Sequence, residues 1–224
     1  MLKKFSPRLA FTFVSLFLLG GLSCTQASAA ETEAVVDTGD TAWVLASTAL
    51  VLFMTIPALA LFYAGLVRKK NVLSVLMQCL VLTALMSIIW VVCGYTLAFG
   101  TPESTSLNRY IGDWDAVMMG GIDSASVHVT SADGEPESGI PTILFAAFQM
   151  TFAIITPALI VGAYVERIGF GFVLLFSGLW MLVCYAPVVH WVWGGGMLAD
   201  GGLFGDTGVK DFAGGLVVHL TWGV

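Results

Sequence analysis

Long uncharged, apolar runs constrain the fold of this chain more than any other feature of its sequence. Four such runs follow one another, and a fifth begins at Phe212. Each of the four exceeds the roughly 20 residues that an α-helix needs to cross about 30 Å of hydrocarbon. Charged residues make up only 11% of the chain, against roughly a quarter in a soluble domain, so much of its surface must face lipid. The sequence therefore predicts an all-α polytopic membrane protein, with spans at about 41–67, 72–100, 140–165, 168–190 and 212–224.

The N-terminal segment has the organisation of a cleavable signal peptide. Basic residues precede a short apolar core at 9–22, and Ala27-Ser28-Ala29 forms an A-x-A cleavage site. We therefore expect residues 1–29 to be removed and residues 30–40 to form a short periplasmic N-terminus. Two alternatives stay open: lipoprotein processing at Cys24, or an uncleaved first helix.

Charged residues between the runs predict the orientation. The basic triplet at 68–70 occupies a very short connection between the first two runs, and the positive-inside rule places that connection in the cytoplasm. The mature N-terminus then lies outside, as cleavage of an export signal requires. We expect outer loops at 101–139 and 191–211. Because the chain has no other basic patch, a nucleic-acid partner is disfavoured.

A histidine inside the fifth run is the sharpest functional candidate. Asp211 precedes a start of small residues and is suited to cap a helix, because its carboxylate can accept backbone N–H bonds. His219 follows about 12 Å further along a helix axis, near the bilayer midplane. An ionisable residue at that depth usually faces a bundle interior or a transport path. A histidine satisfied by a neighbouring helix is the alternative, and Asp211 is either a cap alone or also part of an external site.

Two further groups of polar and aromatic residues are weaker candidates. Gln149 lies about one third into its span, where membrane helices often use glutamine as interhelical glue. The spacing of four puts Phe148 and Phe152 on one helix face, a pattern that ordinary aromatic packing also produces. Trp193 precedes three successive glycines, and such a turn can aim the indole into a vestibule rather than into the interfacial belt.

The remaining titratable residues predict no catalytic chemistry. His190 lies near the outer boundary, where we expect an interfacial residue, and His128 in the outer loop carries no signal. The cysteines of the spans are expected to act as small buried hydrophobes. The spacing of Cys, His and acidic residues predicts neither a disulfide framework nor a metal site, and no acidic partner stands beside the deep histidine. We therefore expect no cofactor, no metal and no enzyme.

Several motifs in order resemble the ammonium transporter family (Amt/Mep/Rh), specifically its bacterial Amt branch. The resemblance covers about residues 40–219, and its order and spacing are highly specific. The motifs that carry it are Leu61-Phe62-Tyr63-Ala64-Gly65-Leu66-Val67-Arg68-Lys69-Lys70-Asn71-Val72-Leu73-Ser74, Phe148-Gln149 with Phe152, Val161-Gly162-Ala163-Tyr164-Val165-Glu166-Arg167, Trp193-Gly194-Gly195-Gly196 and Asp211-Phe212-Ala213-Gly214-Gly215.

The resemblance implies an outer ammonium site and a gate. Phe152 is similar to the outer phenylalanine of the gate. Trp193 is similar to the tryptophan that, with Phe148 and Phe152 nearby, shapes the external site. Gln149 is similar to a glutamine beside the gate.

The resemblance also implies roles for the two residues of the fifth run. Asp211 is similar to the aspartate that organises the external site without touching substrate. His219 is similar to the first member of the pore's twin-histidine pair. The expected function is ammonium/ammonia transport, in which NH4+ is recruited outside and NH3 crosses an apolar pore. Trp222 departs from the family, which usually has a small residue shortly after the histidine.

The fold that the resemblance implies is larger than this chain. The family has about eleven spans in two inverted five-helix repeats. We expect this chain to be the N-terminal portion, the first five-helix repeat with a truncated fifth helix. The resemblance further implies a bacterial inner membrane location, a homotrimer and a cytoplasmic PII-type regulator. Two other functions stay open: an ammonium sensor of the same fold, or a nonfunctional truncated paralogue.

Overall fold

The computed structural model describes residues 35–102, 105–129, 138–205 and 207–223. The predicted signal peptide at 1–29, including Cys24 and Ala29, lies outside the described residues. The described part is mostly helical, and four of its helical segments are long and apolar enough to cross a membrane. They cover Thr38–Leu66, Lys69–Phe99, Thr142–Tyr164 and Phe170–Val192.

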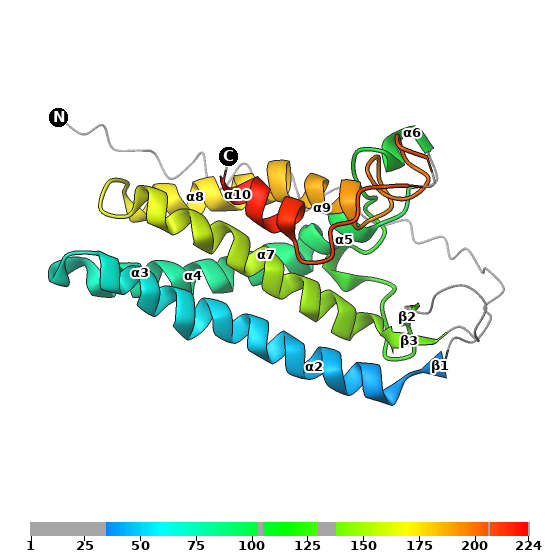
Figure 1. Ribbon diagram of the computed structural model, residues 1–224, viewed down its shortest axis with the longest axis horizontal. Helices are drawn as coiled ribbons and strands as arrows, with labels where there is room; N and C mark the ends of the chain where they lie inside the picture. Colours follow the sequence, from blue (N-terminus) through cyan, green and yellow to red (C-terminus); the bar gives the residue numbers. More distant parts are fainter. Residues whose placement is uncertain (1–34, 103–104, 130–137, 206, 224) are drawn as a thin grey trace. The chain divides into compact units, whose positions relative to one another are not determined.

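Shorter elements build each of these segments (Figure 1). Wider π-helical turns interrupt three of the four. In the first segment such a turn contains Pro57, whose ring removes a backbone donor, and Ile56 beside it has non-helical backbone angles. The elements are α2 (Thr38–Phe53), η1 (Met54–Leu59) and α3 (Ala60–Leu66); η2 (Lys69–Asn71), α4 (Val72–Ile89), η3 (Trp90–Gly94) and α5 (Tyr95–Phe99); α7 (Thr142–Tyr164); and α8 (Phe170–Trp180), η5 (Met181–Tyr185) and α9 (Ala186–Val192). Of these, η1, η3 and η5 are the π-helical turns, whereas η2 is a short 3-10 turn.

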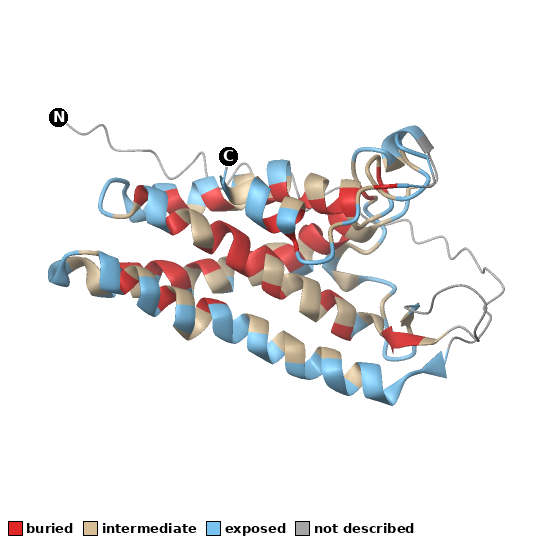
Figure 2. Ribbon diagram, in the orientation of Figure 1, coloured by how far each residue is buried: buried red, intermediate tan, exposed pale blue. Residues whose placement is uncertain are grey.

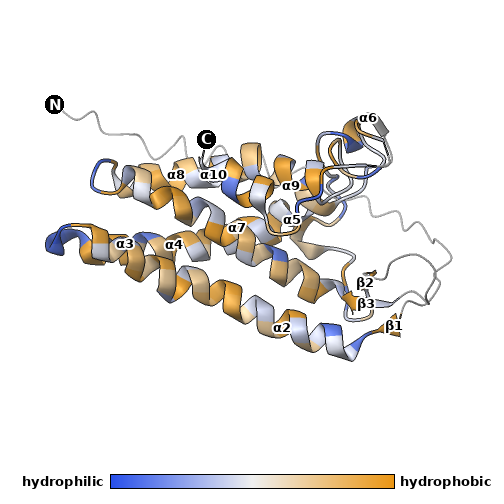
Figure 3. Cartoon of the chain, in the orientation of Figure 1, coloured by the Kyte–Doolittle hydropathy of each residue, from blue (hydrophilic) through white to orange (hydrophobic). Residues whose placement is uncertain are grey.

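The outside of this bundle is apolar, the reverse of a soluble protein. Helix α2 has no buried residue, and Trp43 on it is 72% exposed. Figures 2 and 3 show the same helix as exposed and hydrophobic along most of its length. Such a face is stable only against lipid or another apolar surface. Because the backbone hydrogen bonds are made within each helix, these segments suit a hydrocarbon environment.

Helix α7 is the most buried of the four membrane-capable segments and lies in the interior of the bundle. It packs against α2 and α4 (Figure 1). A Cβ added at Gly162 of α7 would lie 2.6 Å from the ring of Tyr63, whose hydroxyl donates a 2.7 Å hydrogen bond to the carbonyl oxygen of Leu159. The small residue therefore lets α3 and α7 approach closely.

The two short connections lie together at one end of the bundle (Figure 1). The Glu166 carboxylate accepts hydrogen bonds from Asn71 Nδ2 at 2.7 Å and from the backbone N–H of Arg68 at 3.1 Å. The guanidinium of Arg68 lies 3.7 Å from the same carboxylate. These bonds lower the pKa of Glu166. The connections that the charge pattern predicts on one side of the membrane are thus in contact.

A small sheet at the opposite end corrects the all-α expectation. Its strands are β1 (Val35–Val36), β2 (Val127–Val129) and β3 (Ser138–Pro141), in the order β1-β3-β2. Strand β1 pairs parallel to β3, and β2 pairs antiparallel to it. Strands this short carry no readable alternation. They form because packing of the helices brings these connecting segments together, and their backbone N–H and C=O groups then satisfy one another. Two short helices, α6 (Thr105–Asn108) and η4 (Val117–Met119), complete this end.

The fifth helical run begins later than predicted. The elements are η6 (Gly215–Leu220) and α10 (Thr221–Gly223), whereas the sequence predicts a span from residue 212. Phe212 is 93% exposed, and Gly214 adopts the left-handed backbone conformation with φ of 73°. Because a residue in the left-handed conformation cannot be part of a right-handed helix, the helix starts only after Gly214.

Candidate functional site

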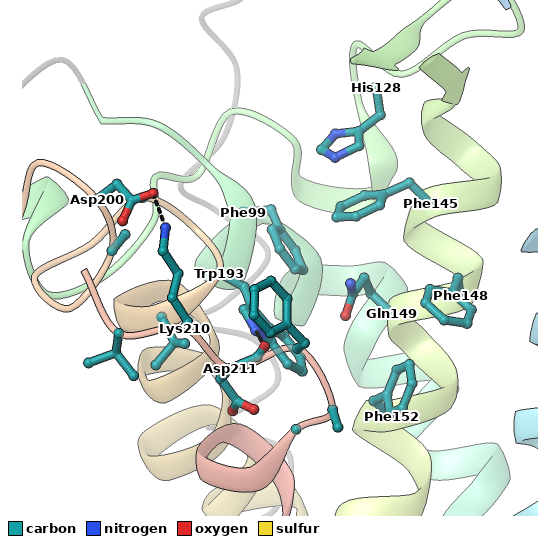
Figure 4. Close-up of a pocket in the computed structure, with 17 residues that line it drawn as sticks. Phe99, His128, Phe145, Phe148, Gln149, Phe152, Trp193, Asp200, Lys210 and Asp211 are labelled. Carbon is teal, nitrogen blue, oxygen red and sulfur yellow. Dashed lines mark hydrogen bonds and ion pairs between the residues drawn. The ribbon is translucent and has the colours of Figure 1, made fainter. Parts of the chain in front are cut away.

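A pocket of about 700 Å³ opens at the sheet end of the bundle (Figure 4). One wall is the N-terminal half of α7, and the other is formed by the end of α9, by Ala199 and Asp200 and by residues 209–214. Of the predicted site residues, it brings together Phe148, Gln149, Phe152, Trp193 and Asp211. These residues are up to 63 positions apart in the sequence, so helix packing alone makes them neighbours.

Helix α7 contributes an aromatic pair and an amide. The rings of Phe148 and Phe152 meet edge to face, with centroids 5.1 Å apart and planes at 87°. Gln149 extends from the helix toward the pocket (Figure 4). Its Oε1 atom is buried and has no hydrogen-bond partner among the described residues. A buried amide oxygen without a partner is costly, because its desolvation is not compensated. A hydrogen-bond donor that enters the pocket would remove that cost.

The glycine turn after α9 directs Trp193 into the pocket. Trp193 directly follows that helix, and a Cβ added at Gly194 would overlap the carbonyl oxygen of Ala98. Gly195 has a positive φ of 81°. Glycine is needed at both positions, at the first for close approach and at the second for its backbone conformation. The Trp193 ring centroid lies 6.4 Å from that of Phe152, with planes at 69°.

Asp211 connects the tryptophan to the start of the fifth helix. Its backbone carbonyl accepts a 2.7 Å hydrogen bond from Trp193 Nε1. Its carboxylate accepts backbone N–H bonds from Gly215 at 2.7 Å, Leu216 at 2.9 Å and Val217 at 2.8 Å. The carboxylate thus caps the N-terminus of η6 although Asp211 lies three residues before Gly214, which occupies the N-cap position itself. This is possible because the chain turns at Gly214 and brings the carboxylate back to the first N–H groups of the helix.

His219 lies apart from this pocket. His219 is exposed, and the Nε1 atom of the Trp222 indole lies 3.5 Å from the Nδ1 atom of the histidine. Trp222, the departure from the family pattern, is therefore next to the histidine ring. The structure does not bring His219 together with the aromatic residues of the pocket, Phe148, Phe152 and Trp193. His219 lies about one turn into η6 and so further along that helix than its cap at Asp211.

His190 is a structural residue and not the interfacial one that its position predicts. It is 0% exposed. Its Nδ1 lies 3.0 Å from the carbonyl oxygen of Ala98, and its Nε2 lies 2.7 Å from that of Asn108. The imidazole thereby ties the end of α9 to α5 and to α6. Its place just before the glycine run is the only hint of this role in the sequence.

Several pocket residues carry no signal in the sequence. His128 lies stacked on Phe145, with centroids 3.6 Å apart and planes at 13°. Lys210 forms an ion pair with Asp200, and this hydrogen bond lowers the pKa of that aspartate (Figure 4). His128 lies on a three-residue strand, and Asp200 and Lys210 lie in irregular segments, so no helical or strand period connects them, and only the folded chain shows that they share a pocket.

The arrangement suits a small cation that donates hydrogen bonds. The aspartate carboxylates are engaged, one by Lys210 and the other by the helix N-terminus, so aromatic faces, the His128 imidazole and one free amide oxygen are what the pocket offers. Aromatic faces attract cations by about 0.5–2 kcal/mol. The described residues contain no group of His, Cys, Asp or Glu that could hold a metal ion.

Comparison with known proteins agrees with the motifs. The model of the Ammonium Transporter Family matches residues 42–224. The putative ammonium transporter of Methanothermobacter thermautotrophicus is 45% identical over 190 residues, which are 85% of this chain and 42% of that protein. The ammonium transporter of Bacillus subtilis is 46% identical over 187 residues, 83% of this chain and 41% of that protein.

Solved structures of transporters share the fold. Saccharomyces cerevisiae Mep2 matches with a TM-score of 0.68 and 32% identity, over 88% of this chain and 40% of that one. A structure described as a Sensor Amt Protein matches with a TM-score of 0.64 and 26% identity, over 80% and 40% of the two chains. This chain thus spans about two fifths of the length of its relatives. It belongs to the ammonium transporter family, a family of multi-pass membrane transporters and not of enzymes.

Proposed function

We propose that this chain forms the part of an ammonium transporter that recruits NH4+ from outside. One observation carries the proposal: the buried, unpaired Oε1 of Gln149 belongs to a pocket that the rings of Phe148, Phe152 and Trp193 also line, at what we take as the outer end. Ammonium combines a single positive charge with four N–H donors. The rings of Phe148, Phe152 and Trp193 would stabilise the charge, and the glutamine oxygen would accept a donor.

Conduction requires a different form of the substrate. A bare charge inside an apolar membrane path costs from a few to more than ten kcal/mol, which contacts with aromatic rings do not offset. Loss of a proton removes this cost, and neutral ammonia can cross while it hydrogen-bonds to imidazole. We assign this role to His219, which follows the outer site along η6. Potassium has no proton to lose, so the same path excludes it.

The surroundings of the chain follow from the same proposal. We place it in a bacterial inner membrane with its mature N-terminus outside, as the first five-helix repeat of an inverted-repeat transporter. The contact between Arg68 and Glu166 supports a common cytoplasmic side for the two short connections. A homotrimer and a PII-type cytoplasmic regulator complete the proposal.

The test is uptake of radiolabelled methylammonium by cells that lack their own ammonium transporters and express the complete reading frame. Gln149→Leu removes the acceptor, and we expect it to reduce uptake about tenfold or more at low substrate concentration, the factor for one lost hydrogen bond to a cation. Gln78→Leu is the matched control, because Gln78 also has a buried, unpaired Oε1 but does not line this pocket. Equal uptake by the two variants would contradict the proposed site.

A sensor is the second candidate function, because one of the structural neighbours is described as a Sensor Amt Protein. A sensor would bind ammonium at the same pocket without net uptake. If cells that express the wild-type protein bind methylammonium but do not accumulate it, the result would favour the sensor. Absence of both binding and uptake would favour the nonfunctional paralogue.

A further inference from the structure

His128 has a fixed position at the edge of the outer pocket. It lies on β2, where it pairs with Ile140 of β3. A Cβ added at Gly139 would overlap the His128 carbonyl oxygen, so the two strands approach closely there. Its imidazole stacks on Phe145 of α7, with 3.6 Å between the ring centroids (Figure 4). The strand pairing and the stack hold the ring on the pocket wall.

The stack continues into the aromatic core of the bundle. The Phe145 ring meets Phe99 edge to face at 5.0 Å, and Phe99 meets Trp90 edge to face at 6.2 Å. Phe99 and Phe145 also line the pocket. The imidazole is therefore the outermost member of a packed row of rings and cannot easily turn away from the pocket without losing this contact.

The carboxylates that the structure describes on the pocket wall are engaged and do not compensate a charge on this imidazole. Strand β3 and the pocket-facing half of α7 contain no charged residue. Across the pocket, Asp200 pairs with Lys210, and the Asp211 carboxylate accepts three backbone N–H bonds. Asp123, on the loop before β2, is engaged by the backbone N–H groups of Ala125 and Ser126.

The ring nitrogens of His128 have no hydrogen-bond partner among the described residues. Burial lowers the pKa of this imidazole from its ordinary value, because the charged form loses hydration. At neutral pH the ring is uncharged and one nitrogen is an acceptor. Below the ordinary histidine pKa of about 6.5 the ring gains a proton as the pH falls, which removes the acceptor and adds a positive charge.

We propose that His128 is an additional specificity residue of the outer site, which accepts a hydrogen bond from the entering ammonium when neutral and repels it when protonated. The inference rests on the proposed function, since it assumes that the pocket receives ammonium. It predicts that acid on the outer side weakens recruitment at a residue separate from Phe148, Phe152 and Trp193.

The test is methylammonium binding to the full chain in lipid nanodiscs. The protein carries 5-fluorotryptophan, and the 19F resonance of Trp193, assigned by its absence in Trp193→Phe, reports occupancy of the pocket. For the wild-type chain we expect Kd to rise by up to about tenfold as the pH falls from about 7.5 to about 4.5, because a group whose pKa lies below about 6.5 becomes largely charged only toward the lower value. Asp115→Asn, which removes a titratable group of the same outer loop outside the pocket, should behave as wild type.

Two substitutions separate the acceptor from the charge. His128→Gln keeps a neutral acceptor and cannot titrate here, so its Kd should stay near the neutral wild-type value at both pH values. His128→Phe keeps a stacking ring without an acceptor, so its Kd should be raised and independent of pH. A wild-type 19F spectrum at neutral pH establishes that a variant is folded, and either variant alone is sufficient for the pH test.

The outcomes distinguish the two proposals. A wild-type Kd that does not change with pH would overturn the role of His128, and so would an equal acid effect in His128→Gln or His128→Phe. Methylammonium binding at neutral pH would leave the proposed function intact in both cases. A wild-type chain that does not bind methylammonium at any pH would overturn the outer ammonium site, and the role of His128 with it.

Discussion

The indole Nε1 of Trp193 donates a 2.7 Å hydrogen bond to the backbone carbonyl oxygen of Asp211. The carboxylate of the same aspartate accepts three backbone N–H bonds at the start of η6. One residue therefore fixes both the aromatic wall of the pocket and the first turn of the helix that carries His219. A change at Asp211 should affect the pocket although its carboxylate is directed to the helix.

Asp211→Ala should lower stability and disturb Trp193 together. Loss of a capping side chain costs about 0.5–2 kcal/mol, and three backbone donors would lose their partner here. We expect a lower thermal unfolding temperature and a broadened 19F resonance of Trp193. Asp211→Asn retains one acceptor oxygen and should show a smaller effect. A sharp, unshifted Trp193 resonance in Asp211→Ala would contradict the coupling.

Gly194→Ala should displace Trp193 from the pocket. The added methyl group would overlap the Ala98 carbonyl oxygen and lie 2.8 Å from the Cα of His190. Such overpacking costs about 1–3 kcal/mol and must move the turn. We expect reduced stability and weaker methylammonium binding in nanodiscs. Gly171→Ala in α8 is the control, since no atom lies within 4 Å of its added Cβ; equal effects of the two substitutions would contradict the argument.

His219→Ala should abolish selective methylammonium uptake without loss of protein from the membrane. The side chain is exposed in this chain, and its one described hydrogen bond, from Trp222 at 3.5 Å, is long and weak. We therefore expect a change in stability within about 0.5 kcal/mol. Leu220→Ala, a neighbouring exposed residue, is the control for uptake. Unchanged uptake and selectivity in His219→Ala would exclude a pore role.

Glu166→Gln should weaken the contact between the two short connections in a pH-dependent way. The hydrogen bonds from Asn71 and Arg68 lower the pKa of Glu166, so the ionised form is favoured in the folded chain. Its stabilising effect is fully present above the ordinary glutamate pKa of about 4.3 and is lost as the pH falls through the lowered value.

Thermal unfolding in detergent at neutral pH and at about pH 3 measures this difference. Wild type should unfold at a higher temperature than Glu166→Gln at neutral pH, and the two should converge in acid. Asp115→Asn, a carboxylate outside this contact, should show no comparable gap. A gap between wild type and Glu166→Gln that persists unchanged in acid would mean that the charge of Glu166 is not its cause.

The sequence by itself determined the membrane class, the approximate positions of four long helices and the family. Hydrophobicity acts over a window of about 20 consecutive residues and does not depend on which helices later become neighbours. The motifs are likewise local: the glycine run after Trp193 and the aspartate eight residues before His219 are visible without coordinates.

Only the tertiary structure decided which of these residues share a pocket. His128 on a strand, Phe145 on α7, Lys210 in an irregular segment and Trp193 after α9 become neighbours through the docking of separate elements, and no periodicity connects them. The same docking buries His190, which its position predicts at the interface, and forms the three-stranded sheet. Local composition determines whether a segment enters the membrane, whereas a binding site depends on side-chain contacts between segments that are distant in sequence.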